Sequence, residues 1–269
     1  MQTYTQKTND LVEFFRKSTG HLRGMAEKSD AFWQPDLGDP RHLHNSYVKN
    51  LAAAYSSKFA DLSEAILSAV DKEDYITYAL CGRALIEASA TLRYYVLHQY
   101  KPLFDKGSFS LDDYKSLLEI DDRHLRGGRF DWEAFGTQRY SKMKEDIVRF
   151  LEEKKNKNKS ELKRAEIAKT ITADQVNVIT CVEKWAVEKP EVLIAYNLFS
   201  DLVHPNIGSN FLVASVSGGK IYFTKNKGEL LGRQIFEQSF PILLAVAHKP
   251  FGGHLAMLLA TCWQDDELN

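Results

Sequence analysis

The feature that most constrains the fold of this chain is a pair of long helical patterns joined by a short charged turn. Over 43–70, apolar residues recur at steps of three and four, which is the period of one face of an α-helix. The charged run 71–74 breaks this pattern and caps a second helix, expected over 74–100 and ended by Pro102. Because two long helices joined by a short turn pack antiparallel, we expect this hairpin to form the core of a helical bundle.

Most of the remaining chain also has helical patterns. We expect further helices at these places: 9–19, a short helix from about 111, 137–153, 172–187, and a helix that begins at Pro190 and ends at His204. The exception is 211–224, where two β-rich segments, 211–216 and 220–224, flank the turn 217–219 and predict a small β-hairpin. The C-terminal part, 229–263, is expected to be helical with interruptions at Pro241 and at 250–253.

No repeat and no linker divides the 269 residues. We therefore predict one mainly α-helical domain over 1–269. Its core is a helical bundle at about 43–210, and the hairpin and C-terminal helices occupy 211–269.

Charge and cysteine usage exclude several classes of function. The formal net charge is −1, so the charge of the whole protein does not attract nucleic acid or an anionic membrane. The cysteines Cys81, Cys181 and Cys262 lie far apart and form no CxxC pair, as expected for reduced thiols in the cytoplasm. No signal core opens the chain, and the apolar region 235–263 is too interrupted for a membrane span. No P-loop, GxGxxG, HExxH or nucleophile-elbow sequence occurs, so we expect neither a cofactor nor a metal.

The first candidate site lies on the second long helix. Arg83 and Glu87 are four positions apart, which places them about 40° from each other on one face of a helix. The surrounding residues are too apolar for that face to be fully solvated. Two interpretations stay open: a surface ion pair worth a few tenths of a kcal/mol, or a partly buried pair that positions another group.

The second candidate site lies on the helix before Pro205. Tyr196, Ser200 and His204 follow one another at steps of four and therefore share one stripe, spread over about 80°. His204 stands at the helix C-terminus, where the unsatisfied carbonyls favour a positive charge. The stripe is either a functional site or a core tyrosine with a capping histidine.

A third pattern is Arg93 followed five positions later by His98. It resembles the Arg-x(4–6)-His signature of the HEPN superfamily, a group of all-helical bacterial and archaeal proteins. In active members the resemblance implies metal-independent RNA cleavage between two protomers: the arginine holds the phosphate and the histidine moves protons. Tyr94 stands where HEPN nucleases usually carry a small polar residue. On an ideal α-helix the two side chains are about 140° apart, so sharing one phosphate requires a local bend or a second protomer.

A broader resemblance covers about 43–210. A group of HEPN-like bacterial proteins shows an Arg-x-x-x-Glu helix and, after an insert, a Tyr-x-x-Leu/Phe-Ser-x-x-x-His helix that ends in proline. This chain is similar at Arg83, Glu87, Tyr196, Ser200 and His204. The resemblance implies a helical bundle in which these two helices pack together, so that Arg83, Glu87, Ser200 and His204 share one pocket.

A basic, glycine-containing loop offers a candidate surface for substrate binding. Arg123, Arg126 and Arg129 lie there beside Phe130 and Trp132. Arginines combined with aromatic rings suit phosphate contacts and base stacking, although neighbouring aspartates offset part of the charge. A solvated loop is the alternative interpretation.

Two functions remain open from the sequence. The first is an RNA-directed HEPN-like protein, such as a toxin or phage-defence endoribonuclease, that binds RNA or a nucleotide as a homodimer. In it Arg83 and Arg93 contact phosphate, His204 or His98 transfers protons, and Glu87 and Ser200 orient them. The second is a non-catalytic binding or regulatory subunit with a protein partner, whose polar cluster specifies helix register.

Overall fold

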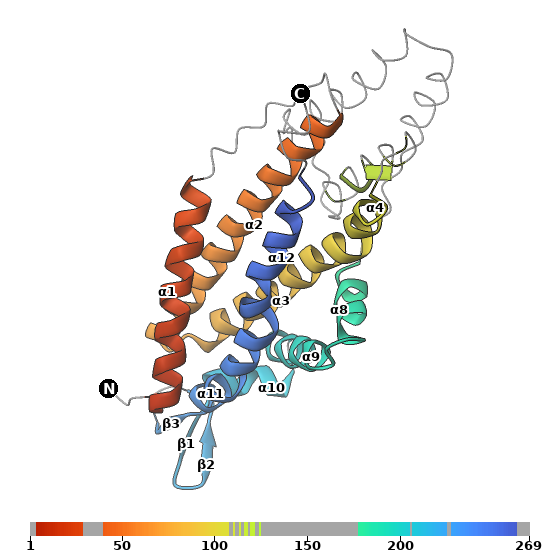
Figure 1. The fold of residues 1–269 in the computed structure, drawn as a ribbon. Coiled ribbons are helices and arrows are strands. Elements are labelled where there is room, and N and C mark those ends of the chain that lie inside the picture. The colour runs from red at the N-terminus through yellow and green to blue at the C-terminus, as the bar shows by residue number, and fades with distance from the viewer. Residues whose placement is uncertain are drawn as a thin grey trace, which may run out of the picture. The chain divides into compact units, whose positions relative to one another are not determined.

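A computed structural model gives the fold of the chain (Figure 1). It describes residues 4–28, 40–107, 177–204, 206–224 and 227–262, and between them Ser110, Asp113, Ser116, Leu117, Glu119, Ile120, Asp121 and His124. The described chain is mainly α-helical with a small antiparallel sheet, as predicted. The predicted arginines of the basic loop, Arg123, Arg126 and Arg129, lie outside the described residues, as does the helix expected over 137–153.

The chain divides into two compact units, each assembled from segments far apart in the sequence. The first consists of Met1–Ala31, Leu51–Tyr94 and Val178–Met257. The second consists of Phe32–Asn50, Tyr95–Asn177 and Leu258–Asn269. The prediction of one domain over 1–269 stays a prediction.

The helical hairpin predicted from the sequence is present. Its helices are α2 (Pro40–Asp71) and α3 (Tyr75–Tyr94), and α1 (Gln6–Lys28) precedes them. Asp74 begins α3 as expected, because its carboxylate accepts hydrogen bonds from the backbone N–H and the hydroxyl of Thr77. Glu73 completes the turn with a φ of 53°, a left-handed conformation that is uncommon for a residue other than glycine.

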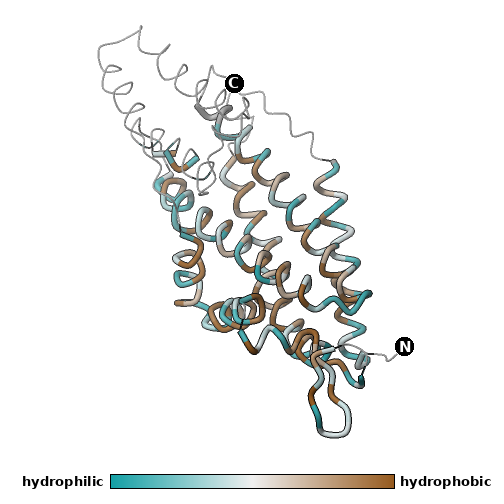
Figure 2. The backbone as a smooth tube through the Cα atoms, turned by 180° about the vertical axis from the view of Figure 1, so that it is seen from behind, coloured by the Kyte–Doolittle hydropathy of each residue, from teal (hydrophilic) through white to brown (hydrophobic). Residues whose placement is uncertain are grey.

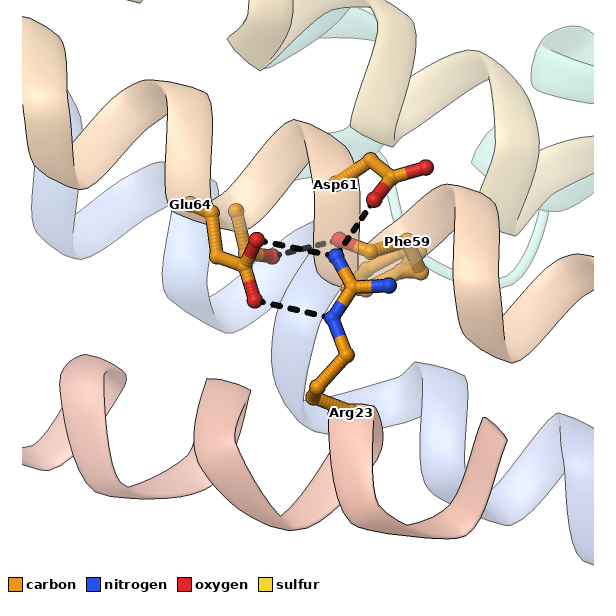
Figure 3. A network of polar contacts seen from close by, with 5 residues as sticks. Arg23, Phe59, Asp61 and Glu64 are labelled. Atoms are coloured by element: carbon orange, nitrogen blue, oxygen red, sulfur yellow. Dashed lines mark hydrogen bonds and ion pairs between the residues drawn. The ribbon is translucent and has the colours of Figure 1, made fainter. Parts of the chain in front are cut away.

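Arg23 ties α1 to the part of α2 that belongs to the first unit (Figure 3). Its guanidinium donates two parallel hydrogen bonds to Glu64, at 3.0 and 2.8 Å, and a third to Asp61. The hydrogen bonds to Glu64, and then to Asp61, raise the pKa of Arg23 above its ordinary value. The contact is a bidentate ion pair at the surface.

The first unit also contains α8 (Val178–Ala186), α9 (Glu191–Val203), the short α10 (Ile207–Asn210) and α11 (Leu231–Leu243). Helix α3 packs against α8, α9 and α11. Aromatic side chains fill the space between the helices; those fully buried in this unit include Phe15, Phe59, Tyr75, Tyr78, Phe199, Phe236, Phe240 and Phe251. Apolar residues, brown in Figure 2, alternate along the helices with polar residues, as expected when one face is buried.

The predicted β-hairpin is also present, although its strands are shorter than expected. Strands β1 (Ser215–Ser217) and β2 (Lys220–Tyr222) pair antiparallel around Gly218 and Gly219. Both glycines have positive φ, 57° and 73°, as a two-residue hairpin turn requires. The first predicted strand began too early, because Phe211–Val213 forms a 3-10 turn (η4). A third strand, β3 (Glu229–Leu230), which the sequence did not predict, pairs with β1.

The interruptions predicted at Pro241 and at 250–253 are wrong. Helical structure runs without a break from α11 through a π-helical stretch, η5 (Leu244–His248), into α12 (Lys249–Leu259). The wider π turn accommodates Pro250, which has no N–H to donate. In its place the Lys189 ammonium donates to the Ala245 carbonyl, at 2.8 Å.

The run Leu231–Leu259 is long and apolar enough to cross a membrane by length and composition. Half of its most apolar stretch is buried within the structure, and a core helix passes the same test. The sequence-based expectation of no membrane partner stays a prediction.

In the second unit, π-helical turns continue the chain after α3. The stretch η1 (Tyr95–Tyr100) leads into α4 (Lys101–Phe104). A buried network forms in this unit: Tyr100 donates a hydrogen bond of 2.8 Å to Asp121, and the other carboxylate oxygen of Asp121 lies 3.2 Å from Nδ1 of His44. Burial first, and then the Asp121 charge, raise the pKa of Tyr100 far above its ordinary range.

Candidate functional site

The structure brings together Arg83, Glu87 and Tyr196, three of the predicted site residues. The Arg83 Nε donates to a Glu87 carboxylate oxygen at 2.9 Å, and its Nη2 donates to the Tyr196 hydroxyl at 3.3 Å. The guanidinium carbon also lies 5.4 Å from the centre of the Tyr196 ring. We refer to these three residues as the arginine cluster. It joins α3 to α9 across 113 residues of sequence.

The arginine cluster is partly buried. The side chains of Arg83 and Glu87 are 28% and 31% exposed, and Tyr196 is buried. Burial disfavours the charge of Arg83, but hydrogen bonding to Glu87 and the nearby Tyr196 outweigh it, so the pKa of Arg83 is raised. Arg83 also contacts a third group, the hydroxyl and ring of Tyr196.

A glycine next to the cluster lets the two helices approach closely. At Gly82 a Cβ atom would lie 2.3 Å from a carbon of the Phe199 ring. The Phe199 ring in turn packs edge-on against Tyr78, with 5.5 Å between the ring centres. Because Gly82 has no side chain, the Phe199 ring of α9 can lie this close to the backbone of α3.

Ser200 and His204 do not take part in this cluster. The Ser200 hydroxyl is buried and has no hydrogen-bond partner among the described residues. His204 ends α9, and its backbone N–H donates to the Ser200 carbonyl. Its side chain is exposed and forms no hydrogen bond or ion pair with a described residue. At 1.5 Å rise per residue, His204 lies about 12 Å along the helix from Tyr196.

Arg93 faces α8 and the turn after it. Its Nη2 donates to Glu188 at 2.5 Å, and its guanidinium lies 5.7 Å from the centre of a Trp185 ring. The arginine side chain is 4% exposed, whereas that of Glu188 is 62% exposed. An arginine that binds substrate phosphate would have to exchange this carboxylate for it.

His98 belongs to the second unit and lies on η1. The change from α-helical to π-helical hydrogen bonding falls between Arg93 and His98, so the α-helical angle of about 140° does not describe this pair.

Two buried histidines in the C-terminal helical run were not among the predicted site residues. His248 contacts the rings of Phe15 and Phe59, and its Nε2 is 2.5 Å from the Ser18 hydroxyl. His254 contacts Trp185 with 5.3 Å between ring centres. Polar residues within an otherwise apolar run were the available sequence signal. Burial lowers the pKa of His248 to about 4.

The donor groups of the described residues do not gather into a metal site, since no three His, Cys, Asp or Glu side chains of this part of the chain converge. The arginine cluster can bind an anionic oxygen or hold a helix register, and Glu87 already supplies one carboxylate. Neither a protein-family model, nor a curated protein, nor a solved structure matches this chain, so its resemblance to HEPN proteins remains a prediction from the two polar helices.

Proposed function

We propose that this protein is a non-catalytic helical binding or regulatory protein, in which the arginine cluster holds α3 and α9 in register. The observation that carries the proposal is the separation of the groups that catalysis would need. A general acid or base must come within about 3 Å of the proton it moves, while the arginine contacts the same phosphate. Arg83 meets Tyr196, but His204 lies about 12 Å further along α9, too far for both to act on one phosphate in one protomer.

The charge pairing of both predicted arginines supports the same proposal. Arg83 is matched by Glu87 and Arg93 by Glu188, so each guanidinium has an acidic partner within its own unit. The Arg93–Glu188 pair joins α3 to the turn after α8, so it favours this packing over alternatives in which the buried arginine is left unpaired.

The second candidate is an RNA-directed, HEPN-like endoribonuclease that acts as a homodimer. The exposure of His204 favours it, because a histidine without a hydrogen bond to a described residue is free to reach a substrate. In this candidate a second copy of the chain brings an arginine and a histidine close together. Arg83 or Arg93 contacts phosphate, His204 or His98 transfers the proton, and Glu87 and Ser200 orient them. A toxin or phage-defence role belongs to this candidate.

Cleavage of RNA separates the two candidates. Purified protein is incubated with total RNA beside the variants His98→Ala and His204→Ala, and the unfolding free energy of each is measured. The binding candidate predicts intact RNA with all three proteins. Cleavage that disappears in His204→Ala or His98→Ala, while the stability is unchanged, would contradict the binding candidate and support the ribonuclease.

The structural role of the arginine cluster has its own test. In a double-mutant cycle of Arg83→Met and Tyr196→Phe we expect a coupling of about 0.5–1 kcal/mol, because the hydroxyl and the guanidinium are direct partners. Tyr222→Phe, on strand β2, is the matched control and should not couple to Arg83→Met. Additive effects of Arg83→Met and Tyr196→Phe would contradict a register-holding cluster.

A further inference from the structure

The hairpin of β1 and β2 projects from the helices of the first unit and carries exposed apolar side chains (Figure 1). Ile221 of β2 is 52% exposed, and Phe223, directly after the strand, is 60% exposed. The Phe223 ring lies nearly parallel to that of Phe211, with 6.4 Å between the ring centres. Apolar side chains gathered on a surface in this way indicate a place where another molecule binds.

Strand β2 lies at the edge of the sheet. The strand order is β2–β1–β3, so one side of β2 faces no other strand of the described chain. The residues that flank a two-residue turn exchange hydrogen bonds, as Lys220 does with Ser217, and the next pair, Ile221 with Val216, does not. The backbone N–H and C=O of Ile221 therefore point away from β1, toward the open edge. An extended peptide can bind such an edge as an added strand.

The two faces of β2 differ in chemistry. Successive side chains of a strand alternate, so Ile221 shares one face with Val216, while Lys220 and Tyr222 lie on the other. The ammonium of Lys227 lies 5.1 Å from the centre of the Tyr222 ring and adds a second positive charge there. The open edge is thus bordered by one apolar face and one basic face.

The hairpin carries positive charge without a counter-charge of its own. No Asp or Glu occurs over 202–228. Lys220 and Lys227 are exposed, and neither forms an ion pair with another described residue. The next acidic residue along the chain, Glu229, lies on β3, on the far side of β1. This charge favours an acidic occupant and disfavours a second copy of the same edge, because like charges would meet.

We propose that the open edge of β2 binds an extended segment of a partner protein in which acidic and apolar residues alternate. The segment runs antiparallel to β2. Its acidic side chains lie beside Lys220 and Lys227, and its apolar side chains lie beside Ile221 and Phe223. This gives the binding or regulatory protein proposed above, on which it rests, the chemistry of its partner.

The geometry also specifies which backbone groups of the segment make the contact. In an antiparallel pair, the residue opposite Ile221 exchanges both hydrogen bonds with it and shares its face of the sheet. That residue is therefore an apolar one, and the N–H groups of the acidic residues point away from β2. Because β2 is only three residues long, neutral strands pair with it weakly, and selectivity comes from the side chains on both faces.

The probe is a labelled peptide of about eight residues in which Glu and Val alternate. Its control has the same composition, with all Glu residues before all Val residues. Binding to the full chain is followed by fluorescence anisotropy and by the amide resonance of Ile221. We expect saturable binding of the alternating peptide and about tenfold weaker binding of the control. N-methylation of the valines should abolish binding, whereas N-methylation of the glutamates should leave it.

A charge reversal on the protein tests the basic face. Lys220→Glu should weaken binding of the alternating peptide about five- to tenfold, because an attraction becomes a repulsion. Lys58→Glu, at an exposed position of α2, reverses the same charge elsewhere and should bind as the unmodified protein does. Thermal unfolding of both variants checks that each remains folded.

Three results overturn the proposal. Equal binding of the alternating and control peptides would leave only an effect of charge. Equal weakening by Lys220→Glu and Lys58→Glu would show that the effect does not come from the hairpin. An Ile221 resonance that responds to phosphatidylserine vesicles, and not to the peptide, would assign the exposed side chains to a membrane surface. None of these results changes the coupling expected between Arg83 and Tyr196, so the role of the arginine cluster is tested separately.

Discussion

The Phe199 ring lies directly against the backbone of Gly82, so close that a Cβ at position 82 would come within 2.3 Å of a ring carbon. This contact sets the distance between α3 and α9 one residue before Arg83 and three residues after Tyr196. The polar contact between Arg83 and Tyr196 thus lies beside a close apolar contact between the same two helices.

Replacing Gly82 by alanine should destabilise the protein. The added methyl group forces Phe199 to move, which costs about 1–3 kcal/mol and exceeds the gain of about 1 kcal/mol in helix propensity. Chemical unfolding measures the change. Gly24→Ala in α1 is the matched control, because nothing lies within 4 Å of its added Cβ, and it should be neutral or stabilising. Equal effects of the two substitutions would contradict the close approach at Gly82.

Stability should fall as the pH is lowered from about 7 to about 5. The pKa of His248 and that of His254 are each lowered to about 4, whereas an unfolded histidine titrates near 6.5. Below pH 6.5 the unfolded chain binds protons that the folded protein does not, so the stability present at neutral pH is lost as the pH falls toward 4. Each histidine contributes about 2 kcal/mol to the loss between pH 7 and pH 5.

Urea unfolding at both pH values tests this expectation. The variants His248→Asn and His254→Asn should each show a smaller difference between the two pH values than the unmodified protein. A pH dependence that is the same in all three proteins would mean that these histidines are not the groups responsible.

The Lys189 ammonium should stabilise the π-helical turn before Pro250. In the π pattern the residue at position 250 would donate its N–H to the Ala245 carbonyl, and proline has none. Since Ala245 is exposed and water can replace the lost donor, Lys189→Met should cost only about 0.5 kcal/mol. In a Pro250→Ala background, where an amide N–H is restored, the cost should disappear. Lys220→Met, on strand β2, serves as the control for loss of a lysine.

The contact of Arg23 with Asp61 and Glu64 should contribute a small, salt-dependent stabilisation. The carboxylates are well exposed, so solvent and ions screen the ion pair. Arg23→Met should lower the midpoint of thermal unfolding at about 0.05 M salt, and the difference should shrink at about 1 M salt. A difference that is independent of salt would point to lost packing of the arginine stem instead.

Much of the fold was predictable because it depends on local periodicity. The hairpin of α2 and α3, its turn at Asp74, the end of α9 at His204 and the glycine turn of the β-hairpin all follow from short-range patterns. The continuity of α11 and α12 was not predictable. A proline ends a helix in most settings, and here the π turn and Lys189, from another part of the chain, compensate for it.

For the candidate site, helical periodicity predicted which residues share a helix face. The step of four placed Arg83 beside Glu87, and the structure confirms their ion pair. Their partners on other helices could not be predicted in this way: Arg83 meets Tyr196, and Arg93 meets Glu188 and Trp185. The period of a helix predicts which side chains share a face. The partner across that face depends on which helices from distant parts of the sequence fit together, as in the contact of Gly82 with Phe199.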